Sequence, residues 1–209
     1  MCSILFYELK LQQILHAYHT HGHFDHILGS ADLKSATSAT LHLHAKDATW
    51  WNGLKRQVRG WGLKESPKFI KCDDFFTSSH DISVGRIKGR ALFTPGHTAG
   101  STSYYFPQLG LVCTGDTLFK LNVGRTDLMD GDFDALQSSI QTVLYALPES
   151  TKVIPGHGPA TVIALEKRMN VIPALEDSQP SKRESRLKGQ GLSAHPCAAC
   201  DHLAHMPHL

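Results

Sequence analysis

Near the start of the chain stands Tyr18-His19-Thr20-His21-Gly22-His23-Phe24-Asp25-His26, with histidine and aspartate at H-x-H-x-D-H spacing directly after a short apolar run. In an extended segment, residues two apart project to the same side, so His21 and His23 can bind one ion together. Asp25 and His26 fall where a helical pattern begins, and their side chains can turn toward a second ion. The spacing therefore predicts a site for two metal ions.

Three further candidate ligands stand at the ends of short apolar runs that stop in a small residue. They are His97 after residues 91–96, Asp116 after residues 111–115, and His157 after residues 152–156. If these runs are strands of one sandwich, their ligands emerge along one edge, where a site would form. Together with the first motif, they give five histidines and two aspartates.

Five motifs carry a resemblance to a known family. They are THGHFDH (residues 20–26), TPGHT (94–98), TGDTLF (114–119), GRTD (124–127) and PGHGP (155–159). In this order they resemble the metallo-β-lactamase-fold hydrolases, in particular small glyoxalase II-like proteins. The resemblance implies an α/β fold, a four-layer αβ/βα sandwich.

The same resemblance implies the assignment of the ligands. His21, His23 and His97 would hold the first metal ion. Asp25, His26 and His157 would hold the second. Asp116 would bridge the two ions.

Length and composition limit the domain organisation. A chain of 209 residues suffices for one domain with a sizeable core and is too short for two comfortable ones. We expect a metallo-β-lactamase-like domain over residues 1–173. Residues 174–209 are predicted to be disordered, because the stretch 178–186 is polar and charged with little to bury.

Charge and cysteine usage narrow the partners and the compartment. A formal net charge of +2, without a long Lys/Arg run, argues against nucleic acid as the main partner. No apolar window is long enough to span a bilayer, and the N-terminus lacks the pattern of a secretion signal. Five cysteines, an odd number, favour a reducing compartment. We expect the cytoplasm; an organelle stays open if an N-terminal segment is missing.

Hydrophobic patterns predict the remaining elements. Family members carry further strands before the H-x-H-x-D-H loop that have no counterpart here, so we expect an incomplete first sheet, most simply from truncation. Strands are predicted at 13–18 (buried) and 39–44, with a strand pair in 73–89 turning at 83–86 and a hairpin over 104–113. Helices are predicted at 27–34, at 133–145 after Asp132 or Gly131, and at 159–170.

Three other groups of residues have alternative interpretations. His42 and His44 imitate the ligand spacing but lack a following Asp-His, so we interpret them as structural. The Trp- and Arg-rich stretch 50–61 is typical of an amphipathic helix, or alternatively of a substrate-facing flap. The tail carries half of a zinc-site pattern, which we interpret as adventitious: Cys197, Cys200, His202 and His205.

The ligand types indicate hydrolysis. Imidazole and carboxylate without thiolate suit two zinc ions and tolerate iron or manganese. Seven ligands for two ions leave positions open for water and substrate, as in a catalytic site. Two ions that share one water lower its pKa to roughly 7, which gives a bridging hydroxide at neutral pH. Asp25 and Asp116 would be catalytic, because Asp25 also orients the nucleophile and Asp116 bridges the two metal ions.

The resemblance favours a glutathione thioester as the small-molecule substrate, hydrolysed to glutathione and a hydroxy acid. Glyoxalase II proper has a C-terminal helical domain, and a Lys and a Tyr in the segment where this chain has GRTD. Arg125 can replace the Lys as an anion anchor, with Arg168 as a second candidate grip. The alternative for Arg125 is a structural ion pair with Asp127 or Asp130.

Two competing interpretations remain. Persulfide dioxygenases, which use one iron ion and dioxygen, are similar through the first motif, His97, Asp116 and GRTD; the PGHGP motif matches the hydrolase version better. The other alternative is an inactive remnant of the fold. The sequence leaves the oligomeric state open.

Overall fold

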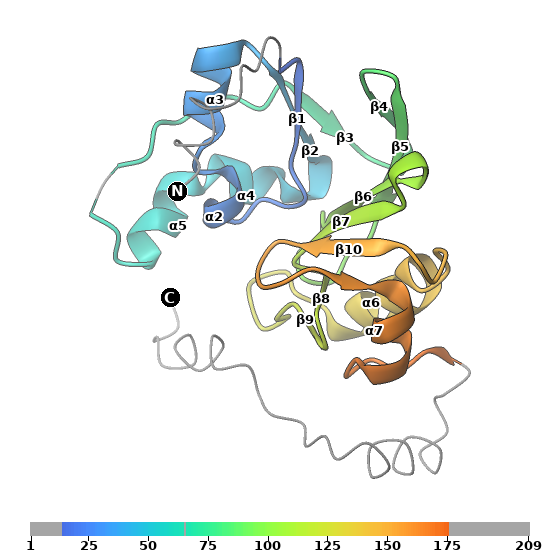
Figure 1. The fold of residues 1–209 in the computed structure, drawn as a ribbon. Coiled ribbons are helices and arrows are strands. Elements are labelled where there is room, and N and C mark those ends of the chain that lie inside the picture. Colours follow the sequence, from blue (N-terminus) through green and yellow to red (C-terminus); the bar gives the residue numbers. More distant parts are fainter. Residues whose placement is uncertain (1–13, 65, 176–209) are drawn as a thin grey trace.

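The computed structural model describes residues 14–64 and 66–175, which form two β-sheets with helices on their outer faces (Figure 1). The first sheet has the order β1-β2-β3, and both pairings are parallel. Its strands are β1 (His16–Tyr18), β2 (Thr40–His44) and β3 (Asp74–Phe76). The predicted α/β class is confirmed.

The second sheet has the order β11-β10-β7-β6-β5-β4. Only the β10–β7 pairing is parallel. Its strands are β4 (His80–Val84), β5 (Ile87–Phe93), β6 (Thr102–Phe106), β7 (Leu111–Gly115), β10 (Lys152–Pro155) and β11 (Thr161–Val162). A separate hairpin pairs β8 (Leu118–Phe119) with β9 (Asn122–Val123).

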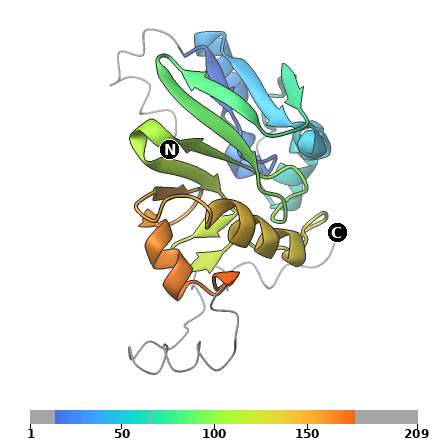
Figure 2. The same cartoon turned by 90° about the vertical axis from the view of Figure 1, so that its right-hand side faces the viewer.

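Helices cover the outer face of each sheet. Figure 2 shows the blue and cyan elements above the green strands and the yellow and orange helices below them, which gives the predicted layers. On the first sheet lie α2 (Phe24–Ile27), α3 (Ser30–Thr37), the 3-10 turn η1 (Ala45–Asp47), α4 (Ala48–Asn52) and α5 (Leu54–Gly60). On the second lie α6 (Phe133–Ser138), its π-helical continuation η3 (Ser139–Leu144), and α7 (Ile163–Met169). The 3-10 turn η2 (Pro107–Leu109) joins β6 to β7.

Apolar side chains fill three clusters between these layers. The cluster under the first sheet includes Leu41 and Leu43, and the one under the second includes Val112 and Ile140. A smaller cluster around Tyr104 lies between the two sheets. Each fully buried Leu or Ile stabilises the fold by roughly 1.5–3 kcal/mol, so the layers hold together through side chains distributed along the whole described sequence.

The structure corrects several predicted elements. β1 is half-buried to exposed rather than buried, because it is the last strand of its sheet among the described residues. The predicted helix 27–34 is interrupted at Gly29, which precedes α3. β3 pairs with β2 in the first sheet, so the hairpin predicted within 73–89 is formed by β4 and β5 alone. The last helix begins at Ile163, because the two residues before it form β11.

Other predicted elements agree with the structure or lie outside the described residues. The Asp132 side chain accepts a hydrogen bond from the N–H of Ala135 and starts α6 as predicted. Predictions for the tail from residue 176 onward, including its cysteines, stay predictions. Across residues 14–64 and 66–175, every helix is too short or too polar to cross a bilayer.

Candidate metal centre

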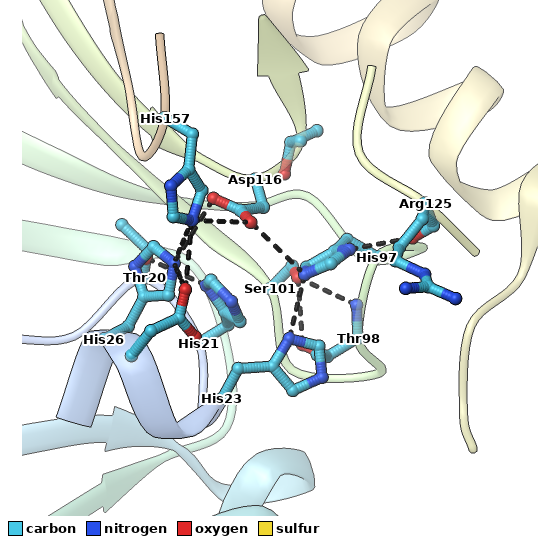
Figure 3. Close-up of polar contacts among 12 residues, drawn as sticks. Thr20, His21, His23, His26, His97, Thr98, Ser101, Asp116, Arg125 and His157 are labelled. Atoms are coloured by element: carbon cyan, nitrogen blue, oxygen red, sulfur yellow. Dashed lines mark hydrogen bonds and ion pairs between the residues drawn. The ribbon is translucent and has the colours of Figure 1, made fainter. Parts of the chain in front are cut away.

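The seven predicted ligands come together although they lie in four separate parts of the chain. Figure 3 labels all of them except Asp25. His21 and His23 lie on the loop between β1 and α2, and Asp25 and His26 lie in the first turn of α2. The other three follow strands of the second sheet: His97 after β5, Asp116 after β7 and His157 after β10. The expectation that strand ends bring these residues together is therefore met.

The first group of donor atoms comes from His21, His23 and His97, which are all buried and lie within 4.8 Å of one another. His23 Nδ1 is 2.9 Å from His97 Nε2. His97 donates from Nδ1 to the backbone oxygen of Arg125 at 2.7 Å, which leaves a lone pair on Nε2 that faces the group. Thr20 Oγ1 lies 3.1 Å from Nδ1 of His21 and orients that ring.

The second group lies beside the first and comes from Asp25, His26 and His157. His26 Nε2 is 3.2 Å from His157 Nε2, and His157 Nε2 is 3.0 Å from Asp25 Oδ2. Asp116 reaches both groups. Its Oδ1 is 3.4 Å from His26 Nε2, and its Oδ2 is 3.6 Å from His97 Nε2.

Protonation differs between the two groups. Burial lowers the pKa of His21 well below its usual value and that of His23 to about 3, and the neighbouring imidazoles add to the effect. Burial also lowers the pKa of His97. Burial by itself would lower the pKa of His26, but contacts with Asp116 and Asp25 raise it to about 9. The first group is thus neutral and ready to ligate at pH 7, whereas the second holds a proton that an ion must displace.

The donor atoms fit divalent metal ions. Among the described residues, His21 Nε2 and Asp116 Oδ1 are buried without a hydrogen-bond partner, which an ion would supply. The two groups and Asp116 contain only imidazole nitrogen and carboxylate oxygen, a set that suits zinc, iron or manganese. Gly156 lets Asp116 and His26 lie close together, because a Cβ at position 156 would collide with Asp116 Oδ1 and lie 2.8 Å from His26 Cε1.

Asp47 supports the centre and was missed by the sequence analysis. Its buried carboxylate accepts hydrogen bonds from the N–H of Gly22 at 2.8 Å, the N–H of Gly100 at 2.7 Å and the hydroxyl of Thr98 at 2.8 Å. These bonds tie the loop of His21 and His23 to the loop that follows His97. Its place at the end of η1, shortly after β2, is a weak sequence signal.

Asp130 makes a second link of this kind. It accepts from the indole N–H of Trp50 at 2.8 Å and from the N–H of Ala99 at 3.1 Å. The ring of Trp50 packs edge-on against that of His23, with centroids 4.5 Å apart. The stretch 50–61 therefore contacts the candidate centre through Trp50, whereas Lys55 and Arg56 on α5 are exposed as an amphipathic helix predicts.

The two candidate substrate-binding arginines differ in position. Arg125 forms a two-point ion pair with Asp127, at 2.6 and 2.7 Å, which is the structural alternative stated above. Its backbone still contacts His97, so it lies beside the centre. Arg168 lies on α7 and donates to Ala164 of the same helix; the structure does not bring it to the cluster. His42 and His44 also lie outside the cluster.

Comparisons with known proteins agree with this geometry. The family model of the metallo-beta-lactamase superfamily matches residues 6–157. The chain is 36% identical over 153 residues to "Probable metallo-hydrolase YqgX" of Bacillus subtilis, covering 72% of each chain. It is 33% identical over 152 residues to hydroxyacylglutathione hydrolase GloC of Haemophilus influenzae, again covering 72% of each.

Two solved structures are similar at 34% identity and cover 80% of this chain and 82% of their own. The BLEG-1 B3 metallo-beta-lactamase superposes with a TM-score of 0.71, and TTHA1623 in a di-iron-bound form with 0.69. The chain therefore belongs to the metallo-beta-lactamase superfamily. Within that superfamily, its fold and matched relatives place it among the metal-dependent hydrolases.

Proposed function

We propose that this protein hydrolyses S-acylglutathione thioesters to glutathione and a hydroxy acid at a centre of two zinc ions. His21, His23 and His97 would hold one ion, and Asp25, His26 and His157 the other. Asp116 would bridge them. Bound there, two divalent ions supply an acidified water at neutral pH and polarise the substrate carbonyl.

The observation that carries the proposal is the second group of ligands. His26 and His157 place their Nε2 atoms 3.2 Å apart, and Asp25 completes a three-donor group next to the first. A centre for one ion needs only the first group. The dioxygenases, which use a single iron, share the first motif with its Asp25 and His26. The completion of the second group by His157 is therefore what favours hydrolysis by two ions.

The side chains of the centre have distinct proposed roles in the reaction. Asp25, with 37% of its side chain exposed, lies at the open side and would accept a hydrogen bond from the attacking water and orient it. His157 is more exposed still, at 56%. His97 keeps its orientation through its bond to Arg125 O, which fixes its tautomer. The buried first group would thus stay rigid while the second faces the substrate.

The choice of substrate rests on similarity and on charge. One relative is named as a hydroxyacylglutathione hydrolase. The backbone oxygen of Arg125 contacts His97 of the first group, and 30% of the Arg125 side chain is exposed. Its guanidinium can bind a glutathione carboxylate while it stays paired with Asp127. The protein would bind this small molecule and neither nucleic acid nor a membrane. It would act in the cytoplasm.

The test is a thioester assay with defined metal content. The zinc-loaded protein should hydrolyse S-lactoylglutathione and carry close to two ions per chain, and it should be much slower on a β-lactam. Binding of a single iron ion, with oxygen uptake on glutathione persulfide, would establish the dioxygenase alternative instead.

A further inference from the structure

A second pair of histidines meets on the first sheet, outside the cluster described above. His16 on β1 and His42 on β2 bring Nδ1 of His16 to 3.0 Å from Nε2 of His42. In the strand register Tyr18, not His16, lies opposite His42, so His16 reaches diagonally across the pair of strands. His44, two residues further along β2, takes no part, because its ring stacks on Phe93.

The distance between the two nitrogen atoms is that of two ligands of one ion. Nitrogen atoms bound to zinc at roughly 2.0–2.1 Å lie about 3.3 Å apart at the tetrahedral angle and about 2.9 Å apart at a right angle, and 3.0 Å falls within this range. In the candidate metal centre, the corresponding distances are 2.9 Å for His23 and His97 and 3.2 Å for His26 and His157. The His16–His42 distance falls between these two values.

A carboxylate fixes the tautomer of His42 from behind. His42 Nδ1 donates to Asp74 Oδ2 at 2.8 Å, because an ionised carboxylate only accepts. The lone pair of His42 is therefore on Nε2, which faces His16. Tyr18 stacks on the His42 ring at 4.5 Å between centroids and holds its plane. An imidazole backed by a carboxylate is the usual arrangement of a metal-ligating histidine.

His16 can supply the second lone pair without a change in charge. Its Nδ1–H donates to His42 Nε2 when no ion is present. A shift of this proton to Nε2 of the same ring leaves both facing nitrogen atoms unprotonated. His16 is exposed, so water can accept a hydrogen bond from the relocated proton and can complete the coordination of an ion. Only 11% of the His42 side chain is exposed, which limits its freedom.

We propose that His16 and His42 bind a divalent transition-metal ion, with zinc as the natural candidate, at a site separate from the candidate metal centre. The ion joins β1 to β2, whose pairing spans only the three residue pairs from His16 to Tyr18. It therefore stabilises the strand at the border of the described first sheet. This site has two protein ligands for one ion, whereas the candidate metal centre has seven for two ions. The new site therefore binds its ion more weakly and fills after the centre.

The test counts zinc ions per full-length chain by equilibrium dialysis over rising free zinc and follows the melting temperature. Wild-type protein should bind one more ion than His16→Gln or His42→Gln, in a late step that raises the melting temperature. Both variants should keep the tight steps and any thioester activity. Asp74→Asn should weaken the late step by about 10-fold or more.

The control is His80→Gln on β4, which should bind as many ions as wild type. All these chains share the cysteines and histidines of the tail, so an ion held there cancels in the comparison. Equal zinc counts in wild type and the two variants would refute the site, and so would loss of the late step in only one of them. Either result leaves the tight steps as an independent test of the proposed function.

Discussion

His26 and His157 are 131 positions apart in the sequence, and their Nε2 atoms lie 3.2 Å from each other. One ring stands at the start of a helix on the first sheet, and the other follows a strand of the second. The two sheets must pack correctly for this pair to form. The second group of ligands is therefore a direct product of the layered fold.

The two ions should respond differently to acid. His26 has a pKa raised to about 9, so below pH 9 a proton competes with the ion held by Asp25, His26 and His157. The pKa values of His21, His23 and His97 are lowered, so protons compete there only in stronger acid. Metal content measured from pH 9 to pH 5 should fall first from two ions to one. Simultaneous loss of both ions would contradict this order.

Replacement of Asp116 should lower both the rate of hydrolysis and the number of bound ions. In Asp116→Ala the carboxylate that reaches both groups is gone, so we expect thioester hydrolysis to fall by more than about 100-fold, beyond the loss typical of residues that only support a ligand. Metal content should drop toward one ion per chain. Asp134→Ala, an exposed aspartate of α6, is the control. An unchanged rate in Asp116→Ala would remove this residue from the mechanism.

Asp47 should matter for stability as well as for metal binding. Asp47→Ala leaves the buried N–H groups of Gly22 and Gly100 without an acceptor, which costs about 2–4 kcal/mol of unfolding free energy. Asp47→Asn should also destabilise, because its amide must turn an N–H toward one of these donors. Denaturant unfolding of both variants measures the effect. Asp81→Asn is the control, since 89% of that side chain is exposed. Equal stability of the Asp47 and Asp81 variants would show that the link is unimportant.

Gly156 provides a steric test of the bridging geometry. A methyl group in Gly156→Ala would occupy the space of Asp116 Oδ1 and crowd His26. Displacement of ligands by about 1 Å can cost on the order of 100-fold in rate, so we expect a loss of that size together with weaker binding of the second ion. Gly60→Ala adds a methyl group that meets nothing within 4 Å and should leave the rate unchanged. Equal rates in the two variants would mean that Gly156 is not closely packed against Asp116 and His26.

The sequence predicted which residues come together at the candidate centre, because each stands in a local pattern. The residues from His21 to His26 form one dense motif, and His97, Asp116 and His157 each follow an apolar run that became a strand. The layered fold followed from the same motifs through the family resemblance.

The rest depended on contacts between distant residues. Asp47 acts on Gly22 and Gly100, which are 25 and 53 positions away, so no local pattern marks it. The membership of β3 in the first sheet depends on its pairing with β2, and its three residues carry no pattern that identifies the partner strand. The ion pair of Arg125 with Asp127 was foreseen as an alternative, but its geometry was needed to establish it.

The most direct test of a two-ion thioesterase is a metal titration of the full-length chain from which metal has first been removed. The rate of S-lactoylglutathione hydrolysis is followed as zinc is added. We predict that the rate rises as the tight sites fill and reaches its maximum at two bound ions per chain, with a parallel rise in the melting temperature, because an ion bound only by the native state stabilises it. A chain that holds two zinc ions and still leaves the thioester intact would contradict the account.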